Sequence, residues 1–186
     1  MTVCFATDMN KKERNILAYR NEDDRCYGLA GMAISLASLD AFDRVVEVSI
    51  DAKGPMVVFS NEFFWGASQS ASPKAVWQRL MNNYHLTTSL AVSNVLSRCL
   101  VRDKGADPTE MLARLKPAIR DEGREVCVLE DDEIEVFYDN TLRSMQRIFS
   151  NRRIYPLVDE LARILARRRR LSGREIAEEL HYLRLF

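Results

Sequence analysis

The stretch that decides the fold is CYGLAGMAISLASLDAF, residues 26–42. Glycine, alanine and serine recur on several faces of the helix that this segment would form. A helix with small residues all round is typically packed closely by its neighbours. We therefore predict a core helix over residues 23–42. Its apolar part, residues 28–39, is only about half of the ~20 residues that a bilayer span requires, which argues against a membrane protein.

Two β-branched runs follow this helix. Residues 45–51 and 56–60 flank the turn-like segment AKGP, a pattern typical of a β-hairpin. Pro55 opens the second run, where a missing N–H donor is tolerated at the start or the edge of a strand. A second hairpin is predicted in EVCVLEDDEIEVFYD, residues 125–139, with the acidic pair at 131–132 in its turn.

Helices are expected over much of the remaining chain. A short one is predicted over residues 11–20, with Asn10 as its cap, and WGASQSAS reads as a loop. The helical pattern of residues 73–102 should divide at NNYHLTTS, because these residues are poor helix formers. Pro108 should open a further helix, which Pro117 should end or kink.

The last third of the sequence has the helical period throughout. Helices are expected over residues 141–151, 156–169 and 173–183. The middle one carries an apolar stripe, formed by Leu157, Leu161, Ile164 and Leu165. Ser172 and Glu175 have the spacing of a capping box, with Leu171 and Ile176 placed to form a hydrophobic staple.

The composition indicates one globular domain. The chain has 186 residues, of which 47% are hydrophobic, and only 7 glycines and 5 prolines. A domain of ~150 residues buries roughly 70% of its unfolded surface, so a sizeable core is expected. We predict a single helix-rich α+β domain over residues 1–186, with an α+β core at 1–138 and a helical part at 139–186.

Charge and cysteine usage narrow the function classes. Lys and Arg together number 27, as do Asp and Glu, whereas nucleic-acid binders usually carry a basic surplus. The cysteines, Cys4, Cys26, Cys99 and Cys127, are far apart and form no C-x-x-C pair. This spacing favours a reduced, cytoplasmic protein without a zinc ribbon.

Residues with catalytic chemistry are scarce. The two histidines, His85 and His181, are far apart, and neither has Asp or Glu at ligand spacing. The sequence contains no phosphate-binding glycine motif and no G-x-S-x-G nucleophile motif. The acidic run at 130–135 is explained at least as well by a solvated turn as by a metal ion. We therefore expect no resident metal and no cofactor.

One window resembles a known family. CYGLAGMAISL is similar to the zinc-binding helix of the FtsH-type ATP-dependent metalloproteases, whose pattern is approximately Tyr-His-Glu-Ala-Gly-His-Ala. The framework residues kept here are Tyr27, Ala30, Gly31 and Ala33. In that family the helix leads into a strand, a short turn with glycine and another strand. This chain has residues 45–50, Gly54 and residues 56–60 in the same order.

The C-terminal region extends the resemblance. LARILARRRRLSGREIAEEL is similar to the family's closing segment, in which Leu-Ser-Gly-x-Glu-Ile recurs; the matching residues are Leu171, Ser172, Gly173, Glu175 and Ile176. The resemblance covers residues 20–60 and 134–180. The centre departs from it, because the family's third zinc ligand, an aspartate, has only a loose counterpart in GADPTEML. Neither Asp107 nor Glu110 falls on that position.

The resemblance implies that the zinc chemistry has been lost. Gly28 and Met32 stand where the family has its two zinc-binding histidines, and Leu29 stands where it has the general-base glutamate. H-E-x-x-H works because residues i and i+4 bring two imidazoles to one zinc while the glutamate activates the bound water. The implied fold is zincin-like, with no catalytic residue. If the resemblance does not hold, the segment is an ordinary buried core helix.

Three functions remain as hypotheses. The first is a catalytically inactive peptidase-like module that binds or scaffolds proteins. Because the family assembles as rings, self-association is an implied expectation, and the nearest strand-pairing edge is Met56, Val57, Val58, Phe59 and Ser60. The second is a residual metal-dependent peptidase that uses Glu110, His85 or the acids at 130–135. The third is a nucleic-acid-binding module that uses Arg167–Arg170.

Overall fold

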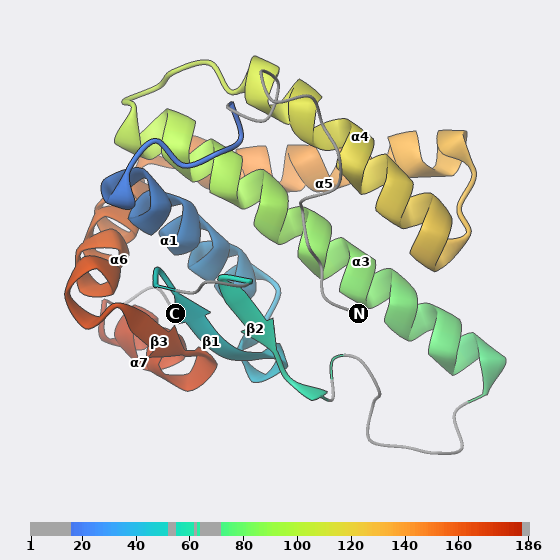
Figure 1. Ribbon diagram of the computed structural model, residues 1–186, viewed down its shortest axis with the longest axis horizontal. Coiled ribbons are helices and arrows are strands. Elements are labelled where there is room, and N and C mark those ends of the chain that lie inside the picture. The colour runs from blue at the N-terminus through green and yellow to red at the C-terminus, as the bar shows by residue number, and fades with distance from the viewer. Residues whose placement is uncertain (1–15, 52–54, 62, 64–71, 184–186) are drawn as a thin grey trace.

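The computed structural model describes residues 16–51, 55–61, 63 and 72–183 (Figure 1). This part of the chain is a helix-rich α+β structure with a small antiparallel sheet, as predicted. Its α-helices are α1 (Glu22–Ser38), α3 (Pro73–Leu96), α4 (Thr109–Cys127), α5 (Asp131–Ser150), α6 (Tyr155–Arg168) and α7 (Gly173–Tyr182). Its strands are β1 (Val45–Ser49), β2 (Val57–Phe59) and β3 (Arg170–Ser172). Short 3₁₀ turns occupy Phe42–Arg44 and Arg152–Ile154, and a π-helical segment, Ser97–Arg102, continues α3.

Helix α1 lies at the centre of this arrangement. It packs against α3 and against α6, while α3 also contacts α4 and α5 (Figure 1). The predicted core helix is therefore confirmed, although it ends at Ser38 rather than at residue 42. A Cβ atom added at Gly31 would lie 2.5 Å from the Ser93 carbonyl oxygen of α3. The small residues thus allow the backbones of α1 and α3 to approach closely.

The predicted hairpin is confirmed, and a third strand joins it. β1 pairs antiparallel with β2, and on its other side it pairs antiparallel with β3, so that the strand order is β2-β1-β3. Val48 of β1 is opposite both Val57 and Leu171. The prediction of a purely helical part at 139–186 is therefore wrong at β3, where three residues complete the sheet of the N-terminal part.

The second predicted hairpin, at residues 125–139, is wrong. α4 continues to Cys127, and α5 begins at Asp131 with a capping box formed by Glu130 and Glu133. The buried residues of α5 recur at intervals of three or four: Ile134, Tyr138, Thr141, Met145 and Phe149. This helical period outweighs the strand preference of the individual Val, Ile and Tyr residues.

The expected break in residues 73–102 is also absent. α3 runs unbroken from Pro73, with Ser72 as its N-cap, because most residues of NNYHLTTS, from Tyr84 on, are buried or partly buried where α3 packs on its neighbours. The Tyr84 hydroxyl donates a hydrogen bond to the Ile119 carbonyl oxygen at 2.9 Å, and its ring stacks on Phe137. Tertiary packing of this kind supplies most helix stability in proteins and overrides a weak intrinsic propensity.

Other local predictions have mixed outcomes. Pro108 precedes α4 as its N-cap residue, and Pro117 lies inside α4 without ending it. The helices expected near residues 141–151, 156–169 and 173–183 are confirmed within α5, α6 and α7. The first half of the helix expected at 11–20 and most of the loop WGASQSAS lie outside the described residues; residues 16–20 are not helical.

The α4–α5 turn generates a prediction about stability. Val128 has φ 54° and ψ 40°, and its side chain is 83% exposed. Left-handed backbone is costly for a β-branched residue and nearly free for glycine. Val128→Gly should therefore stabilise the protein by about 1 kcal/mol, measured as a higher urea midpoint at unchanged m-value.

The matched control uses another exposed valine. Val136 lies inside α5 and is 62% exposed, so Val136→Gly should lose about 0.5 kcal/mol through the lower helix propensity of glycine. Loss of stability in both variants would contradict the assignment of strain to Val128.

Candidate functional site

The positions that the resemblance assigns to zinc chemistry lie on α1 in different surroundings. Gly28 is buried beside α3, and Leu29 is completely buried in the hydrophobic core. Met32, one turn after Gly28, is partly buried and packs against the core. The position that corresponds to the general base therefore points into the core.

The space beside Gly28 is filled by two side chains. A Cβ atom added at Gly28 would lie 2.6 Å from Nδ2 of Asn94 and 2.8 Å from Cε1 of Tyr19. Asn94 Nδ2 donates a hydrogen bond to the Tyr19 hydroxyl at 2.6 Å. These residues do not fit a zinc ion, since an amide and a phenol ring occupy the place of a ligand and Gly28 offers no donor atom.

The described part of the chain also has no other cluster of potential metal ligands. Within residues 16–51, 55–61, 63 and 72–183, no group of three or more His, Cys, Asp or Glu residues is placed to hold a metal ion. Cys26, Cys99 and Cys127 are free and buried.

A buried ion pair lies one turn from Gly28 and was not anticipated from the sequence. Asp24 of α1 is completely buried, and Arg98 of the π-helical segment is 2% exposed. Arg98 Nε lies 2.9 Å from Asp24 Oδ1, and Nη2 lies 2.8 Å from Oδ2, which is a bidentate arrangement. The remaining guanidinium donors reach the carbonyl oxygens of Leu17 and Ala18, each at 3.0 Å.

The surroundings of Asp24 set its protonation. Burial alone would raise the pKa of this carboxyl, but hydrogen bonds from Arg98 and from the backbone and side chain of Arg20 outweigh burial and lower the pKa to about 2. The backbone N–H of Arg20 donates to Asp24 Oδ2 at 2.9 Å. Asp24 is therefore ionised at neutral pH and compensates the buried charge of Arg98.

The candidate strand-pairing edge lies on the outer side of the sheet. Met56, Val58 and Ser60 direct their backbone groups toward β1, as the hydrogen bonds Ser49 N to Met56 O and Ser60 N to Arg44 O indicate. Because these directions alternate along a strand, Val57 directs its backbone groups away from β1. Val58 is 41% exposed, and Val46, at the bulge of β1, is 54% exposed.

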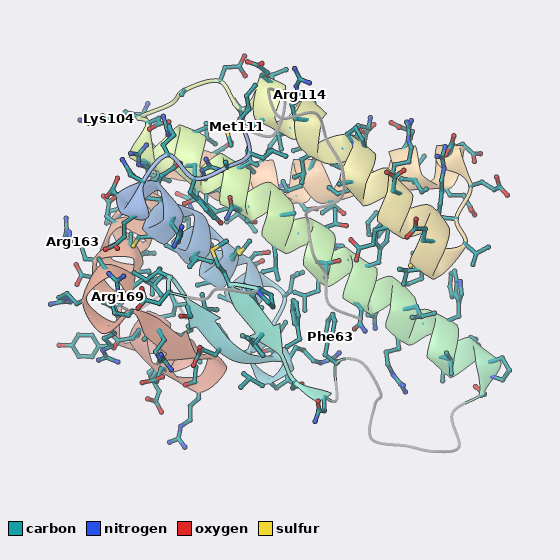
Figure 2. All side chains as sticks on the ribbon, in the orientation of Figure 1. Phe63, Lys104, Met111, Arg114, Arg163 and Arg169 are labelled. Atoms are coloured by element: carbon teal, nitrogen blue, oxygen red, sulfur yellow. The ribbon has the colours of Figure 1, made fainter. Side chains whose placement is uncertain are left out.

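The arginine run 167–170 is matched by carboxylates. The ion pairs are Arg167–Glu160 at 3.5 Å, Arg168–Glu179 at 2.9 Å, Arg169–Glu22 at 2.7 Å and Arg170–Glu47 at 3.7 Å. Arg169 is the left-handed C-cap of α6, beside the sheet (Figure 2). Local carboxylates therefore balance the positive charge of the run. Only its first two residues, Arg167 and Arg168, belong to the last turn of α6.

The sequence around this run behaves as predicted at the start of α7. Ser172 and Glu175 form the capping box, with Glu175 N donating to Ser172 Oγ at 3.2 Å. Leu171 and Ile176, the predicted staple, are both buried in the core.

The groups suggested for a residual metal site are dispersed. Glu110 is exposed in the first turn of α4, whereas the acidic run at 130–135 follows the far end of that helix. At 1.5 Å per residue, roughly 25 Å separate the two ends. The acids cap α5 or pair with cations, as Asp131 does with Arg124. His85 contacts Phe137 edge-on, and burial lowers its pKa.

The buried ion pair generates the second prediction. Asp24→Asn should destabilise the fold by about 3 kcal/mol at pH 7, because it leaves the buried charge of Arg98 without its counterion. The folded-state pKa of Asp24 lies below its ordinary value of 3.8. The ionised carboxylate therefore contributes about 2 kcal/mol above pH ~4, and this contribution is lost as the pH falls from ~4 to ~2.

Urea unfolding of the wild type and the variant at pH 7 and at pH 3 checks both points. The difference between the two proteins should narrow at the lower pH. Asp139→Asn, at an exposed position of α5, is the control and should change stability little at either pH. A constant difference between wild type and Asp24→Asn would contradict the assigned role.

The comparisons with known proteins leave the family open. No family model matches the chain, and neither a curated protein nor a solved structure matches it. Among the described helices, none has the length and apolar character to cross a membrane. A functional assignment therefore depends on the chemistry of the residues described above.

Proposed function

We propose that this chain is a catalytically inactive FtsH-type metallopeptidase-like domain, with a zincin-like fold, that acts as a protein-binding or scaffolding module. The observation that carries the proposal is the packing at Gly28. At the position that the resemblance gives to the first zinc-binding histidine, α1 has no side chain and lies against Asn94 and Tyr19.

The arrangement of the resembling segments supports the relationship. The helix of the first window is followed directly by the antiparallel pair β1–β2. The second window, far away in the sequence, contains β3 and the capped start of α7. β3 pairs with β1, with Leu171 opposite Val48, so the two windows meet in one sheet, as expected if both belong to one ancestral domain.

The chemistry of the same positions supports loss of catalysis. Glycine offers no ligand, and the thioether of Met32 favours softer metals than zinc. Leu29 is buried and has no basic group to activate water. A peptidase of this type needs both the ligands and the base.

The sheet offers a surface for partners. Val57 directs its backbone groups to the outer side of β2, and Val46 and Val58 add exposed apolar surface nearby. An extended segment of a partner protein could extend the sheet by pairing there, and a second copy of the chain would use the same edge. The free thiols of the described cysteines agree with a cytoplasmic location, which is part of the proposal.

Metal content and peptidase activity test the loss of catalysis. Protein purified without chelator should contain far less than one zinc per chain, and casein cleavage should stay at the background level with and without added zinc. Stoichiometric zinc together with chelator-sensitive cleavage would favour the residual peptidase instead. In that case Glu110→Gln and His85→Ala would identify the ligands, since only a ligand substitution should lower both zinc content and cleavage.

A proline substitution tests the strand edge. Val57→Pro removes an N–H that points away from β1, so β1–β2 pairing should persist, as proline is tolerated on edge strands. Binding of edge-dependent partners should fall at least about tenfold, the equivalent of one or two lost backbone hydrogen bonds. Affinity capture followed by titration of the captured proteins, and sedimentation of the purified chain for self-association, provide the measurements.

Val136→Ser is the matched control for this experiment. It changes an exposed valine on α5 instead of the sheet and should leave all binding unchanged. The edge hypothesis fails if every partner captured by the wild type, and any self-association, survives in Val57→Pro.

A further inference from the structure

We infer that the volume a metal would need beside Gly28 is closed by Tyr19 and Asn94, and that these residues, with Asp24 and Arg98, join α1 to α3 without a metal. The comparison with a metal site rests on the proposed function. The closure itself rests on packing alone and can be tested separately.

The space beside Gly28 is already too small for a Cβ atom, the first atom of any side chain. The distances of 2.6 Å and 2.8 Å from an added Cβ of Gly28 to Asn94 and Tyr19 are shorter than real Cβ contacts. An imidazole would extend further into the same space. Restoring the two histidines of the zinc motif would therefore create an overpacked helix interface before any ligand could reach a metal.

The polar contacts follow two successive turns of each helix. Asp24 precedes Gly28 by one turn of α1, and on the facing helix Asn94 precedes Arg98 by one turn. Asp24 meets Arg98, and Gly28 meets Asn94, so the two helices run antiparallel along this seam.

Tyr19 connects the seam to the segment before α1. The guanidinium carbon of Arg98 lies 4.8 Å from the centroid of the Tyr19 ring, within the range of a cation–π contact. Burial raises the pKa of the Tyr19 hydroxyl. The hydroxyl therefore stays neutral and accepts the hydrogen bond from Asn94 without adding a buried charge.

A pair of histidine variants tests whether the site is closed to metal. Gly28→His/Met32→His restores the two ligand positions on α1. Arg143→His/Arg147→His places the same i, i+4 pair on an exposed face of α5. Zinc alone is the probe, with thermal unfolding and equilibrium dialysis as readouts. The α5 variant should bind zinc and gain in Tm when zinc is added.

The α1 variant should behave differently. Its Tm should be at least about 5 °C below that of the wild type, and zinc should neither bind nor raise it. A variant with the wild-type Tm that binds zinc as tightly as the α5 variant would overturn the closure.

A smaller substitution keeps the inference testable if the α1 variant does not fold. Gly28→Ala should lower Tm in the wild-type background and should lower it clearly less in an Asn94→Ala background, because the clashing amide is gone. Equal losses in both backgrounds would overturn the closure. Zinc found in the wild-type protein would instead contradict the proposed function. Failure of the proposed function can therefore be distinguished from failure of this inference.

Discussion

The structure depends on a single buried guanidinium. Arg98 is nearly inaccessible to solvent, and removing such a cation from water is costly unless a counterion and hydrogen-bond acceptors replace the water. Asp24 provides the counterion, and the carbonyl oxygens of Leu17 and Ala18 provide the other acceptors. One side chain thereby fixes the start of α1, the end of α3 and the segment that precedes α1. The close approach of α1 and α3 at Gly31 requires this alignment, because the contacts there leave no room for a shift.

The remaining architecture follows from the central position of α1. One side of this helix meets α3, which in turn carries α4 and α5, and another side meets α6. α6 is capped by Arg169, whose left-handed backbone turns the chain into β3. The guanidinium of the same residue pairs with Glu22 at the start of α1. The sheet is therefore attached to the helical body at the C-terminal end of α6.

Those parts of the fold that have a strong local signal could be predicted. The small-residue helix, the first hairpin and the capping box at Ser172 each follow from residues close together in the sequence. The wrong predictions concern segments in which strand and helix signals of similar strength conflicted, and tertiary packing decided between them. The β-branched and aromatic residues around Val136 resembled a strand but have helical spacing, and Tyr84 holds a weak helical segment against α4. β3 has only three residues and no strand-like composition, so its pairing could not be foreseen.

The candidate site could also be predicted only in part. The sequence indicated Gly28, Leu29 and Met32, because a motif can be compared residue by residue. It gave no sign of Tyr19 or Asn94 and only a weak sign of Arg98, since a contact between distant segments leaves no clear local pattern. An arginine in a serine-rich helix was the one available signal. Its meaning depends on the position of Asp24 in three dimensions.

The pairing of β3 with β1 also constrains the order of folding. Leu171 lies near the end of the described chain, whereas its partner Val48 belongs to the first third. Contacts with such large sequence separation form late, because the entropy of closing the intervening chain must be overcome first. During synthesis on a ribosome, β1 stays uncovered on one side until residues 170–172 have emerged. The nascent chain therefore exposes one edge of β1 while the residues between β1 and β3 are synthesised, and this is the period in which a chaperone would matter most.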